Sequence, residues 1–332
     1  MSKPRRLAHM VKAIVVRESG SAVEEVGEEF LDGDGGLVVD VKFSDLNYKD
    51  AMALTGRPGV VRRHPLVAGI DLVGIVAESD DERFVPGDWV MLNGAGLSET
   101  EHGGYATRAR ISSEYAVALP EGLTPEQAAA LGTAGYTAAL AVLRILSENI
   151  MPDDGPVLVT GATGGVGSTA AQLLANAGYV VYGTTGRAEE LGDFLRSIGV
   201  DEVIDRSTLE EPGKPLQKAL YSAVVDSVGG VTLANAIAQT RKDGVVAACG
   251  LAGSHELPAT VMPFILRGVT LAGIDSVWAS LDDRADAWRI LARGLDLDKL
   301  DSMTTRVDLD GLHAAAEELM AGQRHGRTLV TI

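Results

Sequence analysis

A glycine-rich segment near the middle of the chain constrains the fold most strongly. It begins with the apolar, β-branched run Pro156–Thr160, continues as Gly161-Ala-Thr-Gly-Gly-Val-Gly167 and ends in an Ala/Leu-rich run to Ala177. The first run is typical of a buried parallel strand, and the rest indicates a tight turn that opens a helix. Exposed N–H groups at such a helix start bind a pyrophosphate. We therefore expect a dinucleotide-binding turn, although Ala162 replaces the usual first glycine.

The residues of this turn have separate expected tasks. Gly164 would let the backbone approach the phosphates, and Gly167 would let the helix pack closely on the strand. Gly165 and Val166 lie between them, so all four are predicted cofactor contacts.

The sequence after the turn alternates between strand and helix patterns. This alternation predicts an α/β fold with a doubly wound parallel sheet and helices on both faces. Strands are expected at 157–160, 180–184, 202–204, 223–226, 244–248 and 269–274, and helices at 165–177, 189–198, 216–220, 233–239 and 260–266.

The region before the turn is rich in short strands, which suggests a partly open barrel. Within it, Ser44–Leu54 has helical spacing after a Ser/Asp cap. The final strand, Arg327–Ile332, needs partners, so we expect the C-terminus to return to this front domain. The predicted domains are 10–123 plus 281–332 and, inserted between them, 124–280. Residues 1–9 are interpreted as a disordered leader.

Composition excludes several classes of function. The chain has 332 residues, of which 46% are hydrophobic and 23% charged, which is long enough for two domains. A net charge of −17 argues against general nucleic-acid or anionic-membrane binding, because phosphates would be repelled. The single cysteine allows neither an internal disulfide nor a four-cysteine zinc lobe. With no run of 18 apolar residues or export signal, we expect no membrane span and a cytoplasmic location.

Residues after the second strand of the predicted sheet favour NADP over NAD. An NAD enzyme places an acid there, about 20 residues after the glycines, on the ribose 2′-hydroxyl. This chain instead has Thr184, Thr185, Gly186 and Arg187, and Arg206 follows the third strand. Hydroxyls and two guanidinium groups would bind a 2′-phosphate that a carboxylate would repel. Arg187 taken alone is also compatible with an ordinary surface arginine.

Several segments together resemble the zinc-independent medium-chain dehydrogenases/reductases, and within them the bacterial acrylyl-CoA reductase and quinone oxidoreductase group. The matching segments are Leu46-Asn-Tyr-Lys-Asp50, His64-Pro-Leu-Val-Ala-Gly-Ile-Asp71, Gly132-Thr-Ala-Gly-Tyr-Thr-Ala138, Gly161-Ala-Thr-Gly-Gly-Val-Gly-Ser168, Ala248-Cys-Gly-Leu-Ala-Gly253, Val261-Met-Pro-Phe-Ile-Leu-Arg267 and Gly326-Arg-Thr-Leu-Val330.

The resemblance implies a Rossmann NADPH-binding domain inserted into a GroES-like catalytic domain. It implies reduction of acrylyl-CoA, a small-molecule acyl-CoA substrate, to propionyl-CoA by hydride transfer to the β-carbon. Alternatives are a quinone or enone reductase on the same scaffold and a non-catalytic NADPH-binding protein. The resemblance also suggests a homodimer, for which the strand at 269–274 would pair across a two-fold axis if it forms the sheet edge.

A zinc site is not expected. Where zinc-using relatives have a Gly-His-Glu motif, this chain has Gly69-Ile70-Asp71. The six histidines show no ligand pair at helical or hairpin spacing, and there is one thiol.

The catalytic candidates follow from the chemistry that the resemblance implies. Charge accumulates on the thioester oxygen, so the site needs hydrogen-bond donors and a proton source. Tyr48 is the candidate near the nicotinamide ribose and the reacting centre, with Asn47 as an amide donor or orienting group. Asp71 is either a buried structural carboxylate or orients Tyr48 and the ribose. Arg327 holds cofactor phosphate or the enolate, or pairs with Asp71. The proton comes from water or from a side chain not identified.

Further residues are expected to line the site. Leu251, Ile265 and Ser276 are predicted cofactor contacts without chemistry, and Cys249 is interpreted as an inert buried thiol. A basic loop is either a solvated surface or the anchor for the phosphates of coenzyme A, and its arginines are Arg57, Arg62 and Arg63.

Overall fold

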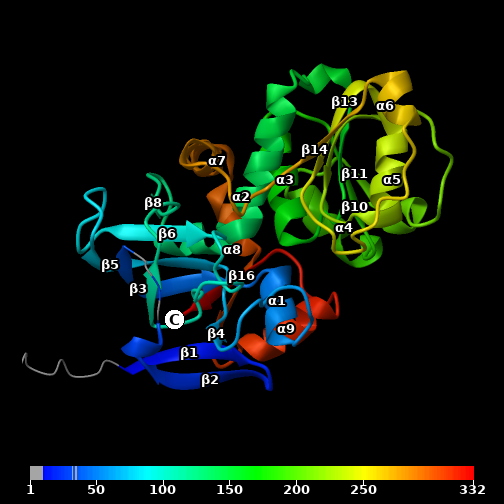
Figure 1. Ribbon diagram of the computed structural model, residues 1–332. Coiled ribbons are helices and arrows are strands. Elements are labelled where there is room, and N and C mark those ends of the chain that lie inside the picture. The colour runs from blue at the N-terminus through cyan, green and yellow to red at the C-terminus, as the bar shows by residue number, and fades with distance from the viewer. Residues whose placement is uncertain (1–9, 32, 34–35) are drawn as a thin grey trace, which may run out of the picture. The chain divides into compact units, whose positions relative to one another are not determined.

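The chain forms two compact units in the computed structural model, which describes residues 10–31, 33 and 36–332 (Figure 1). The leader expected at 1–9 lies outside the described residues. The first unit runs to Thr133 and also contains Thr304–Ile332, and the second unit is Ala134–Met303. The second unit thus begins about ten residues later than the predicted start at 124. It ends at Met303, whereas the predicted end was residue 280.

Hydrogen bonds explain both shifts. The start of α2 (Pro125–Ser147) belongs to the first unit, because the Nε of Arg327 donates to the carbonyl oxygen of Ala130 at 2.5 Å. In the second unit, α7 (Leu281–Gly294) is joined to α3 (Gly165–Asn176), where the Asn176 amide donates to the Gly294 carbonyl oxygen at 2.7 Å. The helix after residue 280 therefore does not return to the first unit.

The first unit is built mainly of strands. They are β1 (Met10–Arg17), β2 (Gly20–Gly27), β3 (Leu37–Asp45), β4 (Leu66–Val67), β5 (Asp71–Ser79), β6 (Trp89–Asn93), β7 (Arg108–Ile111), β8 (Val117–Ala118), β15 (Thr304–Asp308) and β16 (Arg327–Thr331). The helices are α1 (Tyr48–Leu54), α9 (Leu312–Met320) and the short 3₁₀ helix η1 (Glu28–Phe30).

Two sheets organise these strands. The smaller has the order β2-β1-β4, and the larger has the order β15-β16-β3-β5-β6-β8, with β7 also paired to β3. Alternating apolar residues of β3, such as Leu37 and Val39, pack in one core with Leu72 and Val76 of β5. This is the period of two that a half-buried strand requires. β16 pairs antiparallel with β3, which confirms that the C-terminal segment returns to the first unit (Figure 1).

The helix expected from Ser44 begins only at Tyr48. Ser44 and Asp45 instead end β3, where they pair with β16. Asn47 occupies the N-cap of α1, and its backbone N–H donates to the Asp50 carboxylate at 3.0 Å. A carboxylate in the first turn thus binds an N–H group that the helix itself leaves unpaired.

The second unit alternates strands and helices. Its strands are β9 (Val157–Val159), β10 (Val181–Thr185), β11 (Glu202–Asp205), β12 (Tyr221–Asp226), β13 (Thr240–Ala248) and β14 (Thr270–Gly273). Its helices are the remainder of α2, α3, α4 (Ala188–Ser197), α5 (Gly230–Gln239), α6 (Met262–Arg267), α7, α8 (Leu297–Ser302), and the 3₁₀ helices η2 (Pro152–Asp154) and η3 (Arg206–Leu209).

All strands of the second unit are parallel, in the order β11-β10-β9-β12-β13-β14. Figure 1 shows α3 on one side of this sheet and α5 and α6 on the other. The predicted doubly wound sheet is confirmed, and its strand order reverses between β9 and β12, where such folds bind ligands. The helix expected at 216–220 was wrong: this segment is irregular, and the backbone N–H groups of Gln217 and Leu220 donate to the carbonyl oxygens of Ala238 and Gln239 at the end of α5.

Among the residues that the structure describes, one helix, α2, is long and apolar enough to cross a membrane by length and composition. However, 72% of its most apolar window is buried inside the protein. This burial is typical of a core helix.

The buried Asp50 predicts how stability depends on pH. Burial raises the pKa of its carboxyl from 3.8 to about 7. Between these values the folded state binds more protons than the unfolded state, so the free energy of unfolding falls as pH rises. We expect Asp50→Asn to remove up to about 1.4 kcal/mol per pH unit of this decline between pH 5 and 7, measured by urea unfolding. The exposed Asp80→Asn serves as control, and equal slopes for Asp50→Asn and the wild type would contradict the prediction.

Candidate active site

The glycine turn after β9 is shaped to receive an anion. A Cβ on Gly167 would lie 2.3 Å from the carbonyl oxygen of Gly161, so only glycine lets α3 pack this closely on the turn. A Cβ on Gly164 would have only that same oxygen within 4 Å, which leaves this side of the turn open. Gly164 is the N-cap of α3 and Gly165 its first residue, with no side-chain cap on the helix N–H groups. Those groups are thus available to phosphate.

The ends of β10 and β11 lie beside this turn. The N–H of Ala162 donates to the Thr184 carbonyl oxygen at 2.9 Å, and the hydroxyls of Thr163 and Thr185 are 3.5 Å apart. The Thr185 hydroxyl also accepts from the Arg187 N–H at 3.1 Å. The predicted glycine turn and second-strand residues therefore form one surface at the carboxyl edge of the sheet.

Arg206 joins the same surface from the neighbouring strand. A Cβ on Gly186 would lie 2.6 Å from the Nε of Arg206, so the arginine side chain lies directly against this glycine. Each of the two predicted cations has a glutamate close by: Arg187 is 3.7 Å from Glu190, and Arg206 is 2.9 Å from Glu210. These glutamates compensate part of the positive charge of the two guanidinium groups.

The remaining cofactor candidates lie after the later strands. Leu251 follows β13 and is 60% exposed, Ile265 lies in α6 and is 72% exposed, and the half-buried Ser276 follows β14. Cys249 donates to the Asp226 carbonyl oxygen at 3.2 Å, and burial raises the pKa of its thiol to about 12. Such a thiol is protonated at neutral pH, which fits an inert residue rather than a nucleophile.

In the first unit, the Asp71 carboxylate is the centre of a buried polar cluster. Its Oδ1 accepts from the Asn93 amide at 2.7 Å and from the Thr133 hydroxyl at 2.6 Å. Its Oδ2 accepts from the Asn47 amide at 2.7 Å and from the Thr133 backbone N–H at 2.9 Å. Four donors occupy the four acceptor positions of a carboxylate, and Asp71 is only 1% exposed. This geometry favours the structural interpretation over direct contact with a ribose.

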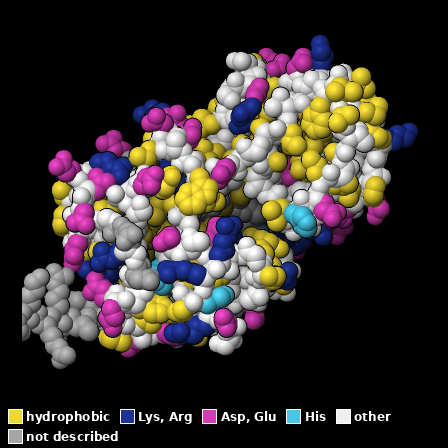
Figure 2. Space-filling view, in the orientation of Figure 1, with side chains coloured by type: hydrophobic (Ala, Val, Ile, Leu, Met, Phe, Trp, Pro, Cys, Tyr) yellow, Lys and Arg dark blue, Asp and Glu magenta, His cyan; other side chains and the backbone are white. Residues whose placement is uncertain are grey.

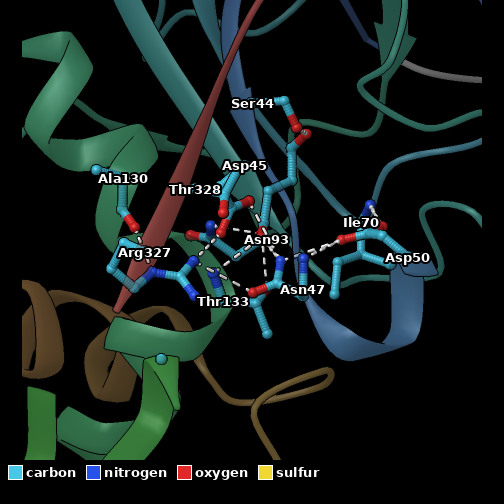
Figure 3. Close-up of polar contacts among 12 residues, drawn as sticks. Ser44, Asp45, Asn47, Asp50, Ile70, Asn93, Ala130, Thr133, Arg327 and Thr328 are labelled. Carbon is cyan, nitrogen blue, oxygen red and sulfur yellow. Dashed lines mark hydrogen bonds and ion pairs between the residues drawn. The ribbon is translucent and has the colours of Figure 1, made fainter. Parts of the chain in front are cut away.

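Asn47 and Arg327 complete the cluster (Figure 3). The Asn47 amide nitrogen contacts the carboxylates of Asp71, Asp45 and Asp50, and its amide oxygen accepts from Arg327 at 3.3 Å. Arg327 forms a short ion pair with Asp45, so its carboxylate partner is Asp45 instead of the expected Asp71. Both polar ends of the Asn47 amide are occupied, which favours an orienting role over donation to substrate.

The cluster holds more carboxylates than cations. Asp45, Asp50 and Asp71 share the cluster with the guanidinium of Arg327, which pairs with Asp45, and all four side chains are buried. Burial raises the pKa of Asp45 well above its usual range, and the neighbouring Asp71 raises it further against the opposing charge of Arg327. A proton is thus retained in the cluster more readily than on exposed aspartates.

Tyr48 differs from these neighbours. It is the first residue of α1, immediately after Asn47, yet it is 40% exposed. The buried cluster binds the preceding Asn47, while the Tyr48 side chain reaches the surface of the unit.

The predicted basic loop follows α1. Arg57 and Arg62 are exposed, and Arg63 is half-buried. Arg62 lies 3.4 Å from Glu99, which also binds Lys49, so part of the positive charge is compensated within the unit.

Sequence reasoning assigned no role to several members of the cluster. These are Asp45, Asp50, Asn93, Gly132 and Thr133. Asn93 was a signal, because it ends the otherwise apolar β6, and Asp45 is the last residue of β3. That Asp45 and Asn93 lie in one cluster with residues of α2 depends on tertiary packing.

Two family models match the chain. The model described as alcohol dehydrogenase GroES-like domain matches residues 33–121, and the model described as zinc-binding dehydrogenase matches residues 165–293. Zinc requires a set of thiolate, imidazole or carboxylate ligands. In residues 10–31, 33 and 36–332, no group of three such side chains is arranged to hold a metal ion, so the residues present do not fit a zinc site.

Full-length relatives are more specific. The chain is 44% identical to the acrylyl-CoA reductase AcuI of Ruegeria pomeroyi over 90% of both chains. It is 39% identical to the quinone oxidoreductase YhfP of Bacillus subtilis, over 93% of this chain and 94% of the relative.

Solved structures agree with these relatives. The crystal structure of the YhdH oxidoreductase from Salmonella enterica in complex with NADP is 42% identical, covers 97% of this chain and 100% of its own, and has a TM-score of 0.94. That of Bacillus subtilis YhfP with NAD bound is 37% identical, covers 97% and 99%, and has a TM-score of 0.91. The chain therefore belongs to the zinc-independent medium-chain dehydrogenases/reductases, in the group that contains the acrylyl-CoA reductases and quinone oxidoreductase YhfP.

Proposed function

We propose that this chain is an NADPH-dependent reductase that converts acrylyl-CoA to propionyl-CoA. The observation that carries the substrate is the 44% identity to an acrylyl-CoA reductase over 90% of both chains. In the reaction, the β-carbon of the C=C bond gains a hydride and the α-carbon gains a proton.

The second unit fits NADPH. The open glycine turn and the uncapped start of α3 would hold the pyrophosphate, and Thr185, Arg187 and Arg206 would hold the 2′-phosphate. When bound, NADPH supplies the hydride. The pair of cations favours NADP over NAD, even though relative YhfP was crystallised with NAD.

The first unit would supply the hydrogen bonds of the reaction. We assign the exposed Tyr48 hydroxyl to the nicotinamide ribose and the reacting centre, where charge develops on the thioester oxygen. Asn47, Asp71 and Arg327 are buried and mutually bonded, so we assign them to holding the Tyr48 backbone. The proton for the α-carbon then comes from water or from Tyr48.

The basic loop is the proposed anchor for the phosphates of coenzyme A. Arg57 and Arg62 are exposed on one loop after α1, and Arg63 lies beside them. Guanidinium groups bind phosphate with two parallel hydrogen bonds, which would offset the repulsion from an acidic protein.

A second candidate function is the reduction of quinones or enones, favoured by the 39% identity to YhfP. Binding of a small quinone needs no phosphate anchor. Changes to the basic loop would therefore distinguish acyl-CoA reduction from quinone or enone reduction. A non-catalytic NADPH-binding protein is the third possibility. The exposed Tyr48 side chain next to the buried polar cluster argues against it.

We also propose a cytoplasmic homodimer. β14 is the last strand of its sheet, so one of its backbone edges has no partner strand within the unit. Close to it in sequence, α6 presents exposed apolar residues including Val261, Ile265 and Leu266, and Figure 2 shows hydrophobic side chains gathered over the α5 and α6 region of the second unit. Pairing of two β14 edges would cover both features.

The proposed substrate predicts a ranking of activities. We expect the highest kcat/KM with acrylyl-CoA when NADPH oxidation is followed with acrylyl-CoA, crotonyl-CoA and a benzoquinone in parallel. A preference for benzoquinone would overturn the first proposal in favour of the second. Binding of NADPH without turnover of any acceptor would favour the non-catalytic protein.

The 2′-phosphate site predicts a selective loss of NADPH affinity. We expect Arg187→Ala or Arg206→Ala to raise the Kd for NADPH about tenfold or more, because a charged hydrogen bond contributes about 1.5–3 kcal/mol. The Kd for NADH should change little, since it lacks that phosphate. Fluorescence titration measures both, with Arg196→Ala on the same helix as control. Equal losses for NADH and NADPH would exclude this site.

The coenzyme A anchor predicts a change in KM that depends on the substrate. Replacing Arg57, Arg62 and Arg63 together by glutamine should raise the KM for acrylyl-CoA about tenfold and leave that for a small enone unchanged. A control variant neutralises Lys12, Arg17 and Arg83, which are exposed cations of the same unit. An unchanged KM for acrylyl-CoA would remove the anchor.

A further inference from the structure

The Asp71 carboxylate joins two segments that are far apart in the sequence. On one side it accepts from Asn47, the N-cap of α1, and on the other it accepts two bonds from Thr133 of α2. Each carboxylate oxygen receives one bond from Thr133 and one from an asparagine. The carboxylate therefore cannot turn to improve one contact without weakening another.

Thr133 has a special place in the chain. It is the last residue of the first unit before the chain enters the second. The preceding residue, Gly132, has φ 48° and ψ −153° and interrupts the helical backbone of α2. A Cβ on Gly132 would lie 2.1 Å from the Asp45 carboxylate, so this non-helical residue packs directly against the buried cluster. The cluster thus fixes the backbone at the end of the first unit.

Asn47 has an equally specific place. It directly precedes Tyr48, and its side chain and backbone N–H are both bonded to buried carboxylates. Displacement of the Asn47 amide would shift the start of α1 and, with it, the exposed Tyr48 side chain.

We propose that Asp71 is a positioning residue that fixes Tyr48 relative to the point where the chain passes to the cofactor-binding unit. It acts through Asn47 on one side and Thr133 on the other. The catalytic part of this inference rests on the proposed role of Tyr48 in reduction. Loss of the Thr133 hydroxyl then disturbs Tyr48 through Asp71 and Asn47.

Thr133→Val tests the linkage with little change of shape. Valine keeps the β-branch and the backbone N–H but removes the hydroxyl that bonds Oδ1 of Asp71. Thr133→Ser restores that hydroxyl. Thr331→Val is the matched control, because Thr331 is a half-buried threonine of the same unit whose hydroxyl bonds a backbone oxygen, that of Val307.

Two measurements are made on the full-length protein. Steady-state kinetics with NADPH and acrylyl-CoA should show kcat lowered about tenfold in Thr133→Val, with the KM for acrylyl-CoA and the Kd for NADPH within twofold of wild type. Amide hydrogen exchange should be faster not only at 128–136 but also at 46–54, around Tyr48. Thr133→Ser should resemble the wild type in both, and Thr331→Val should change neither.

The outcomes separate this inference from the proposed function. Unchanged exchange at 46–54 in Thr133→Val, or a serine variant as impaired as the valine variant, overturns the linkage. Failure of the wild type to reduce acrylyl-CoA overturns the proposed substrate instead. In that case faster exchange at 46–54 still supports the structural linkage, and any acceptor that the wild type reduces provides the kinetic comparison.

Discussion

The burial of three carboxylates around a single guanidinium is the constraint on which the first unit depends. Removing Asp45, Asp50 and Asp71 from water is costly, and Arg327 compensates only one of them directly. The structure offsets the rest with N–H and O–H donors from β6, α1 and α2, so that Asp71 alone accepts four hydrogen bonds. Because these donors come from three different segments, satisfying the carboxylates also fixes how those segments meet.

The second unit meets a different physical demand. An acidic chain can attract an anionic cofactor only through local features, because its net charge repels anions. Backbone N–H groups at the start of α3 and the two arginines after β10 and β11 lie at one edge of the parallel sheet. The parallel arrangement brings these carboxyl ends together, which is why residues 20 to 40 positions apart in the chain form one surface.

Much of the second unit was predictable because its elements carry strong local signals. Its apolar strands and its glycine turn each have a pattern that nearby residues determine. The segment at 216–220 was not predictable in this way, since its backbone N–H groups at Gln217 and Leu220 bond carbonyl oxygens at the end of α5 instead of oxygens within the segment. In the first unit, Ser44 and Asp45 were taken for a helix start, but pairing with β16, nearly 300 residues later, extends β3 through them.

The sequence by itself determined the fold class, the glycine turn, the cations after β10 and the resemblance to a zinc-independent family, because all of these depend on residues close together in the chain. Only the tertiary structure decided that Arg327 pairs with Asp45, that Asn47 has no amide group left for a substrate, and that Asp71 binds Thr133 at the end of the first unit. These contacts join β3, β5, α1, α2 and β16, and no local pattern specifies which buried donor a carboxylate will meet. The physical reason is that burial makes every such group find a partner, whereas packing alone selects that partner.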